Sequence, residues 1–161
     1  MNRLNNLVIL AMALLLFAQP ASSQTKNGFE LGNALVPVEE ILRGGPPRDG
    51  IPSINEPLFQ KPEDVSLWRS DDLMLTYDQG EVSFAYPIGI LNWHEIVNHD
   101  LGGTPLLITF CPLCGTGMAF DPRVDGRPLT FGVSGLLYNS DLLMYDHQTE
   151  SLWSQIEGRA V

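Results

Sequence analysis

The stretch Leu106-Leu107-Ile108-Thr109-Phe110-Cys111-Pro112-Leu113-Cys114-Gly115 decides the fold, because it joins an apolar run to a tight turn. The first five residues predict a strand that is buried on both faces. Pro112 stiffens the turn that follows, and Gly115 permits a backbone angle that other residues avoid. The pattern therefore predicts a buried strand that presents Cys111 and Cys114 together at its end.

Further predicted strands lie on both sides of this segment, and they occur in pairs. Each pair is separated by a short polar or glycine-containing stretch, at residues 78–81, 125–126 and 147–150. Such spacing is typical of β-hairpins, and Asp125-Gly126 is the strongest turn signal among the three. The chain therefore predicts a β-rich α+β fold that consists mainly of antiparallel hairpins.

One amphipathic helix is predicted among the strands, over about residues 90–101. Apolar residues and one histidine recur there at helical spacing, and two glycines follow at residues 102–103. This spacing places His94 on the buried face and Glu95 on the helix surface, where it could at most support neighbouring ligands. Short N-terminal helices are also expected at about residues 37–42 and 62–68, where a proline or acidic residues mark the start.

The N-terminus predicts export. Arg3 precedes an unbroken apolar run over residues 7–17, and small residues follow at 21–23, which is the pattern of a cleaved signal peptide. The run is shorter than the roughly 20 residues that span a membrane, so no stable membrane anchor is expected after cleavage. We expect a signal peptide at residues 1–23, a flexible lead-in at 24–36 and one domain at 37–161, located in the periplasm or outside the cell.

The charge and the cysteine content limit the kinds of function that are compatible with this chain. A formal net charge of −10 disfavours binding to nucleic acid, whose phosphates would be repelled. The chain has two cysteines, at positions 111 and 114. A disulfide between them would close only a short loop, worth about 2 kcal/mol at most, so the pair is a poor structural crosslink.

A soft transition-metal site is the first interpretation of the cysteine pair. Two thiolates and an imidazole suit copper or zinc, and His94 is the expected third ligand because its helix immediately precedes the cysteine strand. Met118 is a further candidate ligand through its thioether sulfur. A second cysteine pair is missing, so a closed four-cysteine zinc site is not expected. Metal carriage or transfer would require a metal-donor partner protein.

Two alternatives remain open. Cys111 and Cys114 could form the dithiol of a periplasmic thiol–disulfide redox protein with its own redox partner, although Gly115-Thr116-Gly117 starts a helix poorly. The chain could also be a non-catalytic interaction protein with a small disulfide. Haem attachment is excluded because Gly115 occupies the position of the required histidine, and no nucleotide-binding motif is expected. Ser134 is a weak nucleophile candidate, and His147 is expected to be solvated.

Several longer motifs resemble a known family. They are Tyr86-Pro87, residues 91–98, 109–115, 131–142 and 149–155. Together they resemble the prokaryotic exported family called domain of unknown function 3179. The resemblance implies a Trp-His-Glu helix followed by a Cys-Pro-x-Cys strand end, which supports pairing His94 with the two cysteines, and it implies no activity. Relatives usually continue beyond the Trp-Ser-Gln segment, so we expect the domain to be incomplete at its C-terminus. They commonly carry arginine at the position of His147.

Overall fold

Antiparallel strands make up most of the structure, which is a computed structural model that describes residues 24–161. The predicted signal peptide, residues 1–23, lies outside the described residues. Within residues 24–161, no helix has both the length and the apolar character needed to cross a membrane.

The larger sheet has five strands in the order β15-β14-β13-β12-β3, and all neighbours are antiparallel. The predicted pairing across residues 147–150 is confirmed, since Leu143 pairs with Ser154 and Tyr145 with Leu152. The strands of this sheet are β3 (Leu42–Arg43), β12 (Phe131–Tyr138), β13 (Asp141–Asp146), β14 (Leu152–Ser154) and β15 (Arg159–Ala160).

The second sheet has four strands in the order β4-β7-β8-β9, with β8 in its interior. The strand pair β4–β7 is parallel, whereas β7–β8 and β8–β9 are antiparallel. Every residue of β8 from Leu106 to Cys111 is buried, as its unbroken apolar sequence predicts. The strands are β4 (Ile54–Asn55), β7 (Ile96–Asp100), β8 (Pro105–Cys111) and β9 (Thr116–Phe120).

Three two-stranded hairpins complete the strand set. Two of them confirm predicted turns, at residues 80–81 and at Asp125-Gly126. The second hairpin is smaller than expected, because the flanking residues join the two larger sheets instead. The hairpin strands are β1 (Thr25–Lys26), β2 (Phe29–Glu30), β5 (Met74–Gln79), β6 (Val82–Pro87), β10 (Arg123–Val124) and β11 (Arg127–Pro128).

The predicted helix over residues 90–101 is wrong in its second half. The one α-helix among the described residues, α2 (Ile88–His94), ends at Glu95, and β7 begins at Ile96. Ile96 and Val97 are β-branched residues that favour strands. They face opposite sides of the sheet, and both are buried because apolar clusters cover its two faces there. The backbone of β7 pairs with β8. Pairing with a buried strand therefore outweighs the helical spacing of the apolar residues.

The short N-terminal helices are also not found in the described part of the chain. The segments form single 3₁₀ turns instead, η1 (Val38–Glu40) and η2 (Pro62–Asp64). Each turn ends at a residue with extended backbone, Ile41 and Val65. Ile41 is fully buried, and Leu42–Arg43 then pairs with β12. Tertiary packing of Ile41 thus keeps this segment extended.

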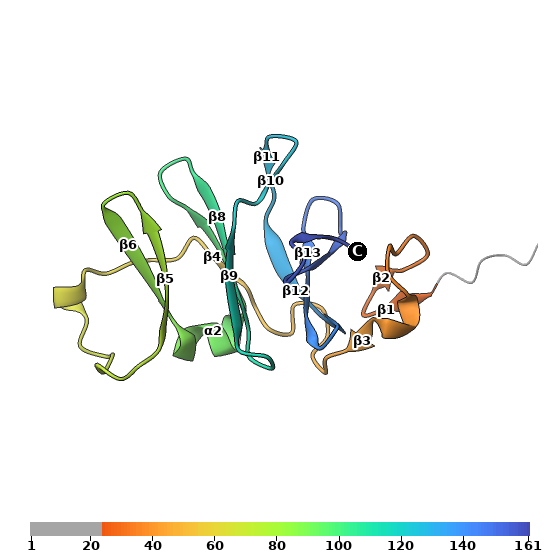
Figure 1. The fold of residues 1–161 in the computed structure, drawn as a ribbon, viewed down its shortest axis with the longest axis horizontal. Coiled ribbons are helices and arrows are strands. Elements are labelled where there is room, and N and C mark those ends of the chain that lie inside the picture. Colours follow the sequence, from red (N-terminus) through yellow and green to blue (C-terminus); the bar gives the residue numbers. More distant parts are fainter. Residues whose placement is uncertain (1–23) are drawn as a thin grey trace, which may run out of the picture.

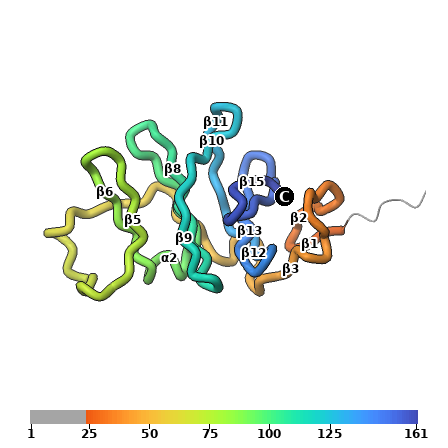
Figure 2. The backbone as a smooth tube through the Cα atoms, viewed as in Figure 1, coloured from red at the N-terminus to blue at the C-terminus, as the bar shows by residue number. Residues whose placement is uncertain are grey.

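The elements follow one another along the long axis of the molecule, from β5–β6 through the two sheets to β1–β2 (Figures 1 and 2). One apolar cluster lies between hairpin β5–β6, α2 and the four-stranded sheet, and a second lies between the two sheets. A third cluster covers the far face of the five-stranded sheet, where Phe29 and Leu31 are buried. Residues 24–36, expected as a flexible lead-in, therefore contribute to the core.

Candidate metal centre

The cysteine turn connects β8 to β9 at the edge of the contact between the two sheets. Cys111 ends β8 and pairs with Thr116, the first residue of β9. The Gly115 N–H donates to the Cys111 carbonyl over 2.8 Å, and Gly115 adopts φ +69°, the left-handed conformation that glycine accepts without strain. The turn thereby fixes both cysteines at the end of a buried strand, as the sequence predicts.

Cys111 lies in the core, where its side chain is 1% exposed. Burial and a hydrogen bond with the Cys114 side chain raise the pKa of the Cys111 thiol to about 12. Backbone N–H groups of Cys114, Leu113 and Leu142 act in the opposite direction, because they hydrogen-bond to the sulfur. The backbone N–H groups around Cys111 therefore favour its thiolate, but they do not outweigh the effect of burial. A nearby positive charge is needed to make the thiolate the stable form.

Asp141 lies beside the cysteines, at the start of β13. Its side chain is 2% exposed, and the Cys114 Sγ donates to Asp141 Oδ1 over 3.0 Å. The turn residues Asn139 and Ser140 both have positive φ, which reverses the chain sharply between β12 and β13. The donor atoms of Cys111, Cys114 and Asp141 all lie within 4.8 Å of one another. These three residues form a group that could hold a metal ion.

Two buried polar atoms near this group have no hydrogen-bond partner. Among the described residues, the buried side-chain atoms without a partner are Asp141 Oδ2 and Gln155 Oε1. Gln155 is anchored beside the site, because its Nε2 donates to Thr109 Oγ1 over 2.9 Å and to the Thr116 carbonyl over 3.1 Å. A buried acceptor without a donor costs about 1–3 kcal/mol. An unpartnered carboxylate oxygen on Asp141, beside the two thiols, fits a bound cation or hydrogen-bond donor.

Glu95 is a half-buried acid near Cys111, and both residues line a cavity of about 40 Å³. The Phe110 N–H donates to the Glu95 carbonyl over 2.7 Å, so the residue lies directly beside the end of β8. Its carboxyl makes no hydrogen bond or ion pair with residues 24–161. Burial raises the pKa of Glu95 from its ordinary value of 4.5 to about 7.

The raised pKa of Glu95 predicts a specific loss of stability with pH. The folded chain binds more protons than the unfolded chain between about pH 4.5 and 7, so the stability contributed by this carboxyl is complete below that interval and is lost as pH rises through it. For metal-free protein above pH 7, we expect Glu95→Gln to raise the free energy of unfolding by about 1–2 kcal/mol, a value that allows for the partial exposure of the side chain. At low pH, where the Glu95 carboxyl is uncharged, the same substitution should change the free energy of unfolding little. Urea denaturation at both pH values measures this, and equal effects at both would contradict it.

The structure does not place all the predicted ligands together. His94 Nδ1 lies 2.8 Å from the Pro52 carbonyl, and His94 is not part of the group of donor atoms within 4.8 Å. Met118 pairs with Thr109 in the β8–β9 register, two residue pairs beyond Cys111 and Thr116. Met118 therefore faces the same side of the sheet as Cys111, since residues two apart on a strand share a face.

Asp141 is not among the ligands predicted from the sequence, and Glu95 is predicted there on the helix surface. The available signal for Asp141 was an acidic residue that interrupts a long apolar segment. Glu95 gave no such signal, because its position depends on where α2 ends. Asp141 and Glu95 are therefore the residues that the structure adds to the candidate site.

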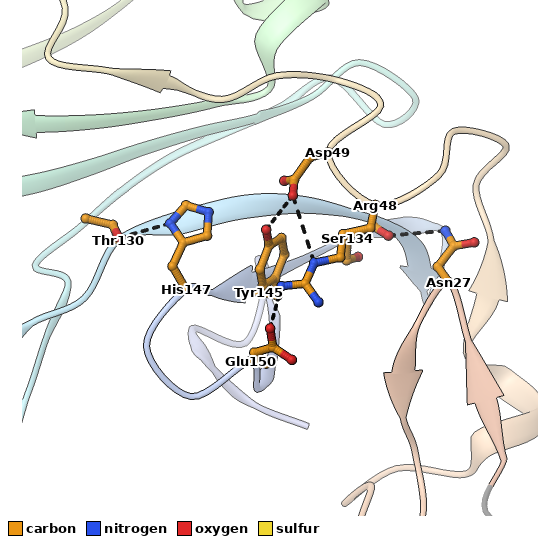
Figure 3. A network of polar contacts seen from close by, with 8 residues as sticks. All are labelled: Asn27, Arg48, Asp49, Thr130, Ser134, Tyr145, His147 and Glu150. Atoms are coloured by element: carbon orange, nitrogen blue, oxygen red, sulfur yellow. Dashed lines mark hydrogen bonds and ion pairs between the residues drawn. The ribbon is translucent and has the colours of Figure 1, made fainter.

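The two weaker sequence candidates belong to a polar network away from the cysteines (Figure 3). Ser134 is fully buried and donates to the Leu143 carbonyl, which is a structural role. His147 Nδ1 lies 3.0 Å from Thr130 Oγ1 on the exposed side of the hairpin. In the same view the Tyr145 hydroxyl donates to Asp49 Oδ2 over 2.6 Å. These contacts hold the loop before β4 against the five-stranded sheet.

A comparison with protein families agrees with the motifs found in the sequence. A family model described as "Protein of unknown function (DUF3179)" matches residues 48–161, which contain both cysteines, Asp141 and Glu95. Neither the curated proteins nor the solved structures compared with the chain give a match.

Proposed function

The chain belongs to the family of proteins of unknown function DUF3179, and we propose that it binds one zinc ion through Cys111, Cys114 and Asp141. The observation that carries this proposal is the unpartnered, buried Oδ2 of Asp141 beside two thiols. A divalent cation would satisfy this oxygen and would offset the cost of ionising the buried Cys111 thiol.

The donor set favours zinc over copper. Copper(I) prefers soft sulfur and imidazole ligands, whereas zinc accepts carboxylate oxygen together with thiolates. Three protein ligands leave at least one position for water or another molecule, which is typical of zinc sites that react or exchange ligands. Cys114 is exposed, so the ion would be reachable from solvent. We therefore propose a reactive or transferable ion.

Metal analysis of the purified protein tests the ligand assignment. We expect one zinc per chain, and a decrease in zinc affinity of at least about tenfold in Asp141→Asn, which keeps the side-chain shape but removes the charge. His94→Ala is the matched control, because the proposed set leaves His94 out, and it should retain the zinc. Loss of zinc in His94→Ala with retention in Asp141→Asn would contradict the assignment and restore the ligand set expected from the sequence.

Export is part of the proposal and rests on the sequence of residues 1–23. We propose that the mature chain acts in the periplasm or outside the cell. The same zinc measurement, made on protein from a periplasmic extract, tests this when the intact mass is determined. A mass that includes residues 1–23 would contradict cleavage at the predicted position.

A thiol–disulfide oxidoreductase is the second candidate, because the sulfur atoms of Cys111 and Cys114 lie within 4.8 Å of each other. The burial of the first cysteine in the motif argues against this candidate. Cys114 is the exposed thiol, and burial raises the pKa of Cys111, so the first cysteine of the motif is neither accessible nor a ready thiolate. Metal-free protein that reduces insulin disulfides would favour this candidate over the zinc site.

A further inference from the structure

The cavity beside Cys111 lies between the two sheets and is lined mainly by aliphatic side chains. Ile51, Val133, Leu136, Leu142 and Leu143 form much of its wall. Its volume of about 40 Å³ is enough for a few non-hydrogen atoms at most. Glu95 is the acidic residue of the lining and Cys111 is the proposed zinc ligand in it. Glu95 and a proposed metal ligand thus line one small, otherwise apolar space.

The backbone of Glu95 is held in an unfavourable conformation at this position. Its φ of 57° and ψ of −35° lie outside the regions that residues other than glycine prefer. Two hydrogen bonds fix it there, from Glu95 N–H to the Leu91 carbonyl over 2.8 Å and from Phe110 N–H to the Glu95 carbonyl over 2.7 Å. Backbone strain of this kind concentrates at functional sites. A glycine or asparagine would end the helix at lower cost, and neither would present a carboxylate to the cavity.

We propose that this cavity is the ligand position of the zinc site, and that it holds a small neutral hydrogen-bond donor between the ion and Glu95. Water fits this description, as does a hydroxyl or amino compound of two or three non-hydrogen atoms. The ion would bind the lone pair of the ligand, and the Glu95 carboxylate would accept a hydrogen bond from it. This inference rests on the proposed zinc site and names the class of molecule that the site receives.

The charge of Glu95 gives this position a selectivity that can be measured. A donor ligand gains a hydrogen bond to a charged acceptor, which is stronger than one to a neutral amide. A small anion without a proton to donate is repelled by the same carboxylate. Replacing Glu95 by glutamine should therefore weaken the first kind of ligand and strengthen the second. A general loosening of the fold would instead weaken both.

Cobalt-substituted protein allows both ligands to be followed by absorption spectroscopy. Cobalt(II) bound to the two sulfurs gives a thiolate-to-metal charge-transfer band, which reports on the proposed ligands independently of Glu95. Hydroxylamine is the neutral donor probe and azide the anionic probe, each titrated at about pH 8, where the Glu95 carboxyl is ionised. Glu81→Gln, an exposed acid of the β5–β6 turn, is the matched control.

For Glu95→Gln we expect hydroxylamine affinity to fall about five- to tenfold and azide affinity to rise by a similar factor. Glu81→Gln should change neither. Unchanged or equally reduced affinities in Glu95→Gln would overturn the inference while leaving the zinc site standing. Absence of the charge-transfer band in the unmodified protein would overturn the zinc site, and this inference with it.

Discussion

Zinc is expected to stabilise the metal-free chain against unfolding by about 4 kcal/mol when free zinc exceeds its dissociation constant a thousandfold. The reason is that the proposed ligands meet only in the folded chain. Asp141 is 27 residues away from Cys114 in sequence, and the two come together only when β13 packs beside the cysteine turn. Urea denaturation of metal-free protein, with and without added zinc, measures the difference in unfolding free energy.

Two variants assign this stabilisation to the proposed ligands. Cys111→Ser retains the size of a small buried side chain but removes the sulfur, so zinc should no longer shift the urea midpoint. Met118→Leu replaces the thioether with a residue of similar volume and should keep the full shift, because Met118 lies two residue pairs farther along β9 than the Cys111–Thr116 pair. A zinc-dependent shift that survives in Cys111→Ser would contradict the site.

The part of the site that follows from local sequence was predicted, and the part that depends on tertiary contacts was not. Cys111 and Cys114 lie on one turn, so their proximity follows from the spacing and from the buried strand before them. Asp141 reaches the cysteines only through the packing of one sheet on the other. A single sequence contains no signal for such a pairing, and an acid near a turn is most simply interpreted as part of the turn.

The fold shows the same division. Hairpin β5–β6 was predicted because its strands alternate and its turn is short. The helix was predicted too long because residues 96–101 include Val97 and Leu101, which fit the helical spacing of the preceding residues. Strand pairing with β8 determines their structure, and the end of α2 at Glu95 determines which acid lies beside Cys111. Because the helix was predicted too long, Glu95 was expected on the helix surface and not beside Cys111.

Gly135→Ala is expected to lower the free energy of unfolding by about 2–5 kcal/mol. Gly135 lies in the bulge of β12 between Val133 and Leu136 and has φ +69°, which an alanine adopts only with strain. A Cβ at this position would also lie 2.2 Å from the Pro46 carbonyl oxygen, a backbone atom that cannot move alone. The Gly44 N–H donates to the Gly135 carbonyl over 2.8 Å, so the clash would separate two hydrogen-bonded segments.

Gly126→Ala separates the two causes of this loss. Gly126 has a similar φ of +75°, but a Cβ there would meet no atom within 4 Å. Its cost should be the conformational term alone, about 1–2 kcal/mol. Urea denaturation of both variants gives the difference, which is the contribution of the contact with Pro46. Equal losses of unfolding free energy in the two variants would mean that the loop at Pro46 moves away from an added Cβ at little cost. Because Gly135 and Pro46 also line the cavity beside Cys111, such a yielding loop would leave the shape of the proposed ligand position undefined.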